Sequence, residues 1–104
     1  MITGKNYIGN RLSVSGNKRY KTFNPELNKE NSVEFTEATS EEIQDAVDLA
    51  SKAFGEFRFI SGKRKAVFLN AIAEEILALD NELIETYCAE TALPEGRAKG
   101  ERGR

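Results

Sequence analysis

The run from Lys63 to Leu93 contains neither Pro nor Gly and carries an apolar residue every three or four positions. That spacing places these side chains on one face of an α-helix; they are Leu69, Ile72, Ala73, Ile76, Leu79, Leu83 and Tyr87. Ser61 is a typical N-cap residue before the run, and Pro94 ends or restarts the helix after it. The sequence therefore predicts one long helix from about Ser61 to Leu93. We expect a helix of this length to contact something outside a 104-residue chain.

A second amphipathic segment precedes this run. Thr39-Ser40-Glu41-Glu42 has the pattern of a capping box, in which the Thr hydroxyl and the Glu side chain each bind a free backbone N–H. The following apolar residues again share one helical face; they are Ile43, Ala46, Val47, Ala50, Ala53, Phe54 and Phe57. The short link from Phe59 to Gly62 predicts that the two long helices pack antiparallel.

The first forty residues have the composition of β-structure. Residues 2–9, 19–23 and 32–38 alternate polar and apolar positions and predict three strands. Residues 10–17 are rich in Ser, Gly and Asn, which favours a loop, and the first two strands could pair as a hairpin.

This order predicts an α+β unit of strands followed by two long antiparallel helices. A complete doubly wound sheet is excluded, because no strand is predicted after the helices. We expect the chain to be a piece of a larger protein.

Composition narrows the function classes. The formal charge is −2, so the balance of acidic and basic residues does not indicate a nucleic-acid partner. No apolar stretch is long enough to span a membrane. One Cys, no His and no signal-peptide pattern favour a cytoplasmic protein without His-based acid–base catalysis.

Two local features could carry chemistry. Cys88 is the only thiol and has no His to activate it, so we interpret it as structural. Arg97 to Arg104 holds four basic residues with Gly100 and Gly103. A phosphate cradle is conceivable there, but no strand precedes it, and a flexible or partner-docking end is the favoured interpretation.

The chain resembles the N-terminal segment of the aldehyde dehydrogenase superfamily. The matching blocks, in order, are Asn6-Tyr7-Ile8-Gly9, Phe23-Asn24-Pro25, Ala38-Thr39-Ser40-Glu41-Glu42-Ile43, Ser61-Gly62-Lys63-Arg64 and Glu90-Thr91. Ala89-Glu90-Thr91-Ala92-Leu93-Pro94, followed by Arg97 and Gly100-Glu101-Arg102-Gly103-Arg104, looks most like the α-ketoglutarate semialdehyde (2,5-dioxopentanoate) dehydrogenase branch.

The resemblance implies an oxidoreductase that oxidises an aldehyde to its acid with NAD or NADP, in a parent protein that is usually oligomeric. Residues 1–104 would be the N-terminal part of a Rossmann-like cofactor-binding domain. The family's nucleophile, deacylating Glu and cofactor-binding residues lie in later segments, so the chain alone is expected to be a truncated, inactive piece that binds no cofactor. Its partners would be the remainder of the enzyme or another copy of the chain.

The resemblance also implies one minor site. Some family members bind a monovalent cation through carbonyl oxygens before Asn-Pro and a carboxylate late in the long helix. The matching positions are Thr22, Phe23 and Glu90, and oxygen ligands suit a hard cation.

Two other interpretations of the chain's function remain open. A self-standing helical module could dock a partner on the second face of the long helix. An Arg-rich end that binds nucleic acid is a weaker possibility, which would require salt-dependent affinity.

Overall fold

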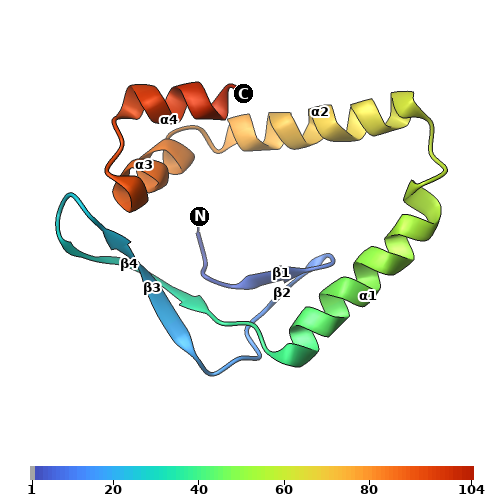
Figure 1. The fold of residues 1–104 in the computed structure, drawn as a ribbon, viewed down its shortest axis with the longest axis horizontal. Coiled ribbons are helices and arrows are strands. Elements are labelled where there is room, and N and C mark those ends of the chain that lie inside the picture. Colours follow the sequence, from blue (N-terminus) through green and yellow to red (C-terminus); the bar gives the residue numbers. More distant parts are fainter. Residues whose placement is uncertain (1) are drawn as a thin grey trace. The chain divides into compact units, whose positions relative to one another are not determined.

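The computed structural model describes residues 2–104 and contains four strands and four helices. They follow one another as two short hairpins and then four helices (Figure 1). Their bounds are β1 Asn6–Ile8, β2 Arg11–Ser13, β3 Arg19–Asn24, β4 Lys29–Thr36, α1 Ser40–Phe57, α2 Gly62–Ala78, α3 Asp80–Thr91 and α4 Glu95–Arg102. The α+β class and the strands-then-helices order agree with the sequence prediction.

The chain divides into two compact units, which we describe separately. The N-terminal unit comprises residues 2–21 and 33–61, and the C-terminal unit comprises residues 22–32 and 62–104. Helix α1 belongs to the first unit and helix α2 to the second. The predicted antiparallel packing of these two helices therefore stays a prediction.

The strand pairing differs from the prediction. β1 pairs antiparallel with β2, with Tyr7 opposite Leu12, and β3 pairs with β4 in a separate two-stranded sheet. The predicted hairpin between the first strand and residues 19–23 is thus wrong, because part of the expected loop, Arg11–Ser13, is itself a strand. Gly9 has a φ of 59° at the β1–β2 turn, a left-handed value that Gly adopts at little cost.

Helix α1 begins as the sequence predicts. The Thr39 hydroxyl accepts a hydrogen bond from the backbone N–H of Glu42 at 3.1 Å. The Glu42 carboxylate accepts one from the backbone N–H of Thr39 at 2.9 Å, which completes the capping box. Two otherwise unpaired N–H groups are satisfied in this way, so the start of the helix is determined locally.

The long helix predicted from Ser61 to Leu93 is interrupted. α2 ends at Ala78, α3 starts at Asp80, and Asp80 has a left-handed φ of 41°. The backbone N–H of Leu79 donates to the Ile76 carbonyl at 3.3 Å, a bond that tightens the final turn of α2. The prediction of one continuous helix is therefore wrong.

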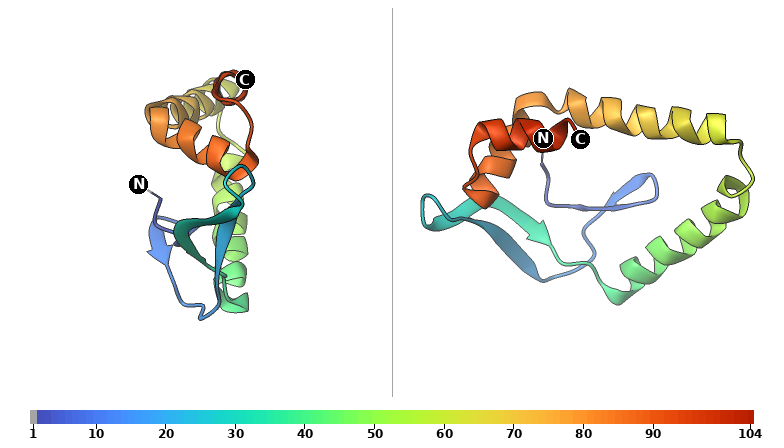
Figure 2. Two further views of the ribbon diagram at one scale, coloured as in Figure 1. Left: turned by 90° about the vertical axis from the view of Figure 1, so that its left-hand side faces the viewer. Right: turned by 45° about the horizontal axis from the view of Figure 1, so that its top comes forward.

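Helices α3 and α4 lie side by side as a helical hairpin (Figure 2). Ala92 ends α3 with a left-handed φ of 56°, and Pro94 precedes α4. Ile84 of α3 and Ala98 of α4 are the buried apolar residues of the C-terminal unit.

Large apolar side chains remain exposed along both long helices. Val47 of α1 is 56 % exposed, Ile76 of α2 is 42 % exposed, and α2 has no buried residue. None of the helices in the described part of the chain is long and apolar enough to cross a membrane.

Candidate functional site

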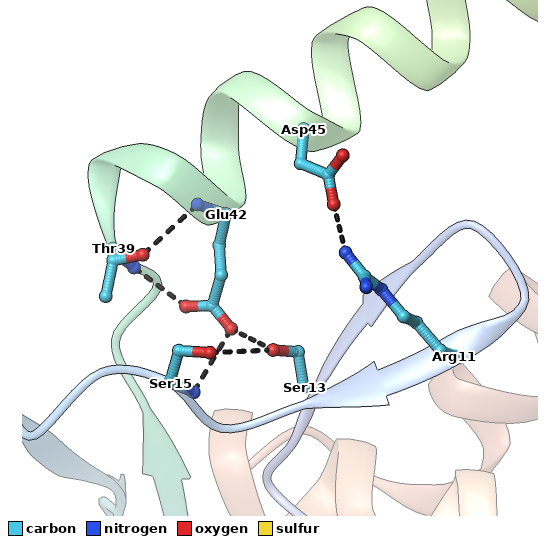
Figure 3. Close-up of polar contacts among 6 residues, drawn as sticks. All are labelled: Arg11, Ser13, Ser15, Thr39, Glu42 and Asp45. Carbon is cyan, nitrogen blue, oxygen red and sulfur yellow. Dashed lines mark hydrogen bonds and ion pairs between the residues drawn. The ribbon is translucent and has the colours of Figure 1, made fainter.

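A cluster of polar side chains in the N-terminal unit surrounds Glu42 at the start of α1 (Figure 3). Besides its bond from Thr39, the Glu42 carboxylate accepts hydrogen bonds from the Ser13 hydroxyl and from the backbone N–H of Ser15, the latter at 3.2 Å. Ser13 ends β2, and Ser15 lies just after it. One buried carboxylate therefore connects the end of the first hairpin to the first turn of α1.

These donors determine the protonation state of the carboxylate. The hydrogen bond from the Ser13 hydroxyl, followed by that from the Thr39 backbone N–H, lowers the pKa of Glu42 from 4.5 to about 2. A carboxylate with this pKa stays ionised at neutral pH and is a poor general acid or base. Glu42 is therefore suited to joining β2 and α1.

An open pocket of about 840 Å³ lies beside this cluster, within the N-terminal unit. Arg11 and Asp45, which both line the pocket, form an ion pair (Figure 3). The lining is mostly polar, with four acidic residues, and it contains no Cys or Lys; the residues are Arg11, Leu12, Ser13, Ser15, Thr39, Glu41, Glu42, Gln44, Asp45 and Asp48. The lining holds neither His nor Lys, so carboxylates are the bases beside its Ser and Thr hydroxyls.

Cys88 lines a smaller pocket of about 430 Å³ in the C-terminal unit. The thiol is half-buried, and its pocket is formed by Glu26, Asn81, Ile84, Glu85, Leu93, Pro94 and Glu95. No basic side chain is among these lining residues, and the sequence contains no His. The surroundings fit the structural role predicted for Cys88, because no cationic side chain lines the pocket to stabilise a thiolate.

Most of the Arg-rich end is a helix rather than a flexible segment, and the alternative prediction of a partner-docking end stays a prediction. Each of its basic side chains is paired with a carboxylate. The pairs are Lys99–Glu95 at 2.5 Å, Arg97–Glu101 at 2.9 Å, Arg102–Asp80 at 3.4 Å and Arg104–Glu101 at 3.5 Å. The bond from Lys99 also lowers the pKa of Glu95, in the first turn of α4. An anion at this helix start would meet a carboxylate, so the arrangement does not favour phosphate or nucleic acid.

The three residues predicted to hold a monovalent cation all belong to the C-terminal unit. Thr22 lies in β3, where its hydroxyl accepts a hydrogen bond from the Asn31 side-chain amide at 3.0 Å. Phe23 is 50 % exposed, and Glu90 is exposed on the last turn of α3. The cation site stays a prediction.

A dinucleotide cofactor needs a Gly-rich turn between a strand and a helix, whose free N–H groups hold the pyrophosphate. The corresponding connection here runs from β4 to α1 through Glu37, Ala38 and Thr39, and it contains no Gly. The Thr39 hydroxyl already occupies the N–H of Glu42 at the helix start. The residues of this connection therefore do not fit a nicotinamide dinucleotide.

Sequence reasoning missed the interactions between distant residues. It identified the capping box but not the bonds of Ser13 and Ser15 to Glu42, which span 29 and 27 residues. It also missed the ion pairs Arg11–Asp45 and Arg102–Asp80. No local spacing marks such contacts, since each depends on where another element packs.

Comparison with known families supplies the class of protein. The model of the aldehyde dehydrogenase family matches residues 13–104, from the end of β2 through the last helix. The chain therefore belongs to the aldehyde dehydrogenase family, which is a family of oxidoreductases.

Two curated relatives carry more specific names. The chain is 36 % identical to "Alpha-ketoglutaric semialdehyde dehydrogenase 2" of Azospirillum brasilense, over 99 % of this chain and 20 % of that protein. It is 30 % identical to "Alpha-ketoglutaric semialdehyde dehydrogenase" of Acinetobacter baylyi, over 97 % of this chain and 19 % of that protein. The chain thus spans about a fifth of the length of these relatives. The search of solved structures gave no significant match.

Proposed function

We propose that this chain is the N-terminal part of the cofactor-binding domain of an NAD- or NADP-dependent aldehyde dehydrogenase with a Rossmann-like fold. The proposed parent enzyme oxidises an aldehyde, most specifically α-ketoglutarate semialdehyde, to its acid in the cytoplasm. The observation that carries the proposal is the family match over residues 13–104, together with two relatives named for this substrate.

The chemistry of the described residues supports a structural, rather than a catalytic, role for this chain in the parent enzyme. The buried carboxylate, Glu42, is held ionised by its hydrogen bonds, and Cys88 has no basic neighbour among its pocket residues. A family reaction needs a thiolate nucleophile and a base of suitable pKa close together. We therefore propose that the nucleophile, the deacylating Glu and the cofactor-binding residues are supplied by other segments of the parent enzyme.

The direct test is a chimaera. The segment of the Azospirillum brasilense relative that matches this chain is replaced by residues 1–104, and reduction of NAD⁺ and NADP⁺ is measured with α-ketoglutarate semialdehyde. We expect the chimaera to oxidise this aldehyde. The isolated chain, assayed in parallel, is expected to reduce neither cofactor.

Two controls make the result interpretable. A chimaera that melts cooperatively, with the oligomeric state of its host, yet oxidises no aldehyde would contradict the proposal. If the isolated chain reduced cofactor, its Cys88→Ser variant would decide the source: loss of activity would make Cys88 a nucleophile, and retained activity would indicate a site elsewhere in the chain.

We further propose that the partner of this chain is the remainder of an oligomeric enzyme or another copy of the chain, with a small aldehyde as the substrate of the parent and no nucleic acid or membrane partner. The exposed apolar side chains of α1 and α2 support an extensive contact, because soluble monomers rarely leave such surface open.

The same exposure favours one alternative, a self-standing helical module that binds another protein. The coding sequence beyond Arg104 distinguishes the two proposals. A continuing frame with a Gly-rich cofactor loop and a Cys nucleophile supports the enzyme, and a stop codon supports the module.

A further inference from the structure

We draw no further inference here: the strongest candidate, the row of exposed apolar side chains along α1 from Ile43 to Phe57, carries none because nothing in the structure shows what covers it.

Discussion

The backbone N–H of Ser15 donates to the carboxylate of Glu42 at 3.2 Å, across 27 residues of sequence. With the Ser13 hydroxyl on the same carboxylate oxygen, this bond connects the first hairpin to α1. The capping-box Glu is thereby both a local helix signal and a tertiary contact. Its ionisation should therefore influence the stability of the N-terminal unit.

We expect the free energy of unfolding to decrease in acid because of Glu42. The pKa of Glu42 is lowered to about 2 in the folded chain, whereas an unperturbed Glu has a value of 4.5. The unfolded state therefore binds the proton first, and the stabilisation is complete above about pH 4.5 and is lost as the pH falls towards 2. Urea midpoints measured between pH 2 and pH 6 test this.

Glu42→Gln keeps a side chain that can accept from Thr39 but cannot ionise, so its midpoint should depend less on pH than that of the wild type. Glu41→Gln is the matched control, since it removes a carboxylate from the same turn and no bond joins Glu41 to Ser13 or Ser15. The same pH dependence in wild type and Glu42→Gln would contradict the assignment.

Two glycines of the N-terminal unit should respond oppositely to Ala. A Cβ at Gly16 would collide with the backbone carbonyl oxygen of Glu37, so the backbone must shift, at a cost of about 1–3 kcal/mol. A Cβ at Gly55, inside α1, meets no atom within 4 Å. Gly55→Ala should therefore raise stability by roughly 0.5–1 kcal/mol through helix propensity.

Denaturant unfolding of the two variants, monitored by circular dichroism, provides the measurement. If Gly16→Ala were as stable as the wild type, residues 16 and 37 would not approach each other as the structure shows.

Two isoleucines of the C-terminal unit form a second matched pair. Ile84 is 4 % exposed and Ile76 is 42 % exposed. Because the side chains are identical, the difference in burial alone predicts that Ile84→Ala costs about 2–5 kcal/mol and that Ile76→Ala costs clearly less.

Thermal or urea unfolding of both variants at one pH tests this prediction. Equal losses at the two positions would show that Ile76 is covered too, which is what the predicted antiparallel contact of α1 with α2 requires.

The isolated 104-residue chain should self-associate. Three large apolar side chains are each 50 % exposed, namely Phe23, Phe68 and Leu77. Further apolar side chains of α1 and α2 are exposed as well. At roughly 25 cal/mol per Å², several hundred Å² of exposed apolar surface favour association strongly. Sedimentation over a wide concentration range should show dimers or larger species.

The association should persist in high salt, because salt screens exposed charges but does not weaken apolar contacts. A monodisperse monomer that melts cooperatively would contradict this expectation. It would also favour the proposal of a self-standing helical module over that of an enzyme segment.

The local elements were predictable where the interactions that form them are local. The Thr39–Glu42 capping box joins residues three apart, and both of its bonds are present. The strands at residues 19–23 and 32–38 were placed within a few residues of β3 and β4. β2 was missed because Arg11–Ser13 is short and pairs only across a turn with Gly9 in a left-handed conformation.

The sequence by itself determined where α1 begins and which of its faces is apolar, because both features depend on residues a few positions apart. The short matching blocks likewise indicated the family. Only the tertiary structure decided that α2 ends at Ala78, where periodicity had predicted an unbroken helix. A left-handed Asp80 costs free energy locally. Beyond the break, Ile84 of α3 and Ala98 of α4 are buried. Their burial depends on contacts between elements, which the helical period of the sequence does not reveal.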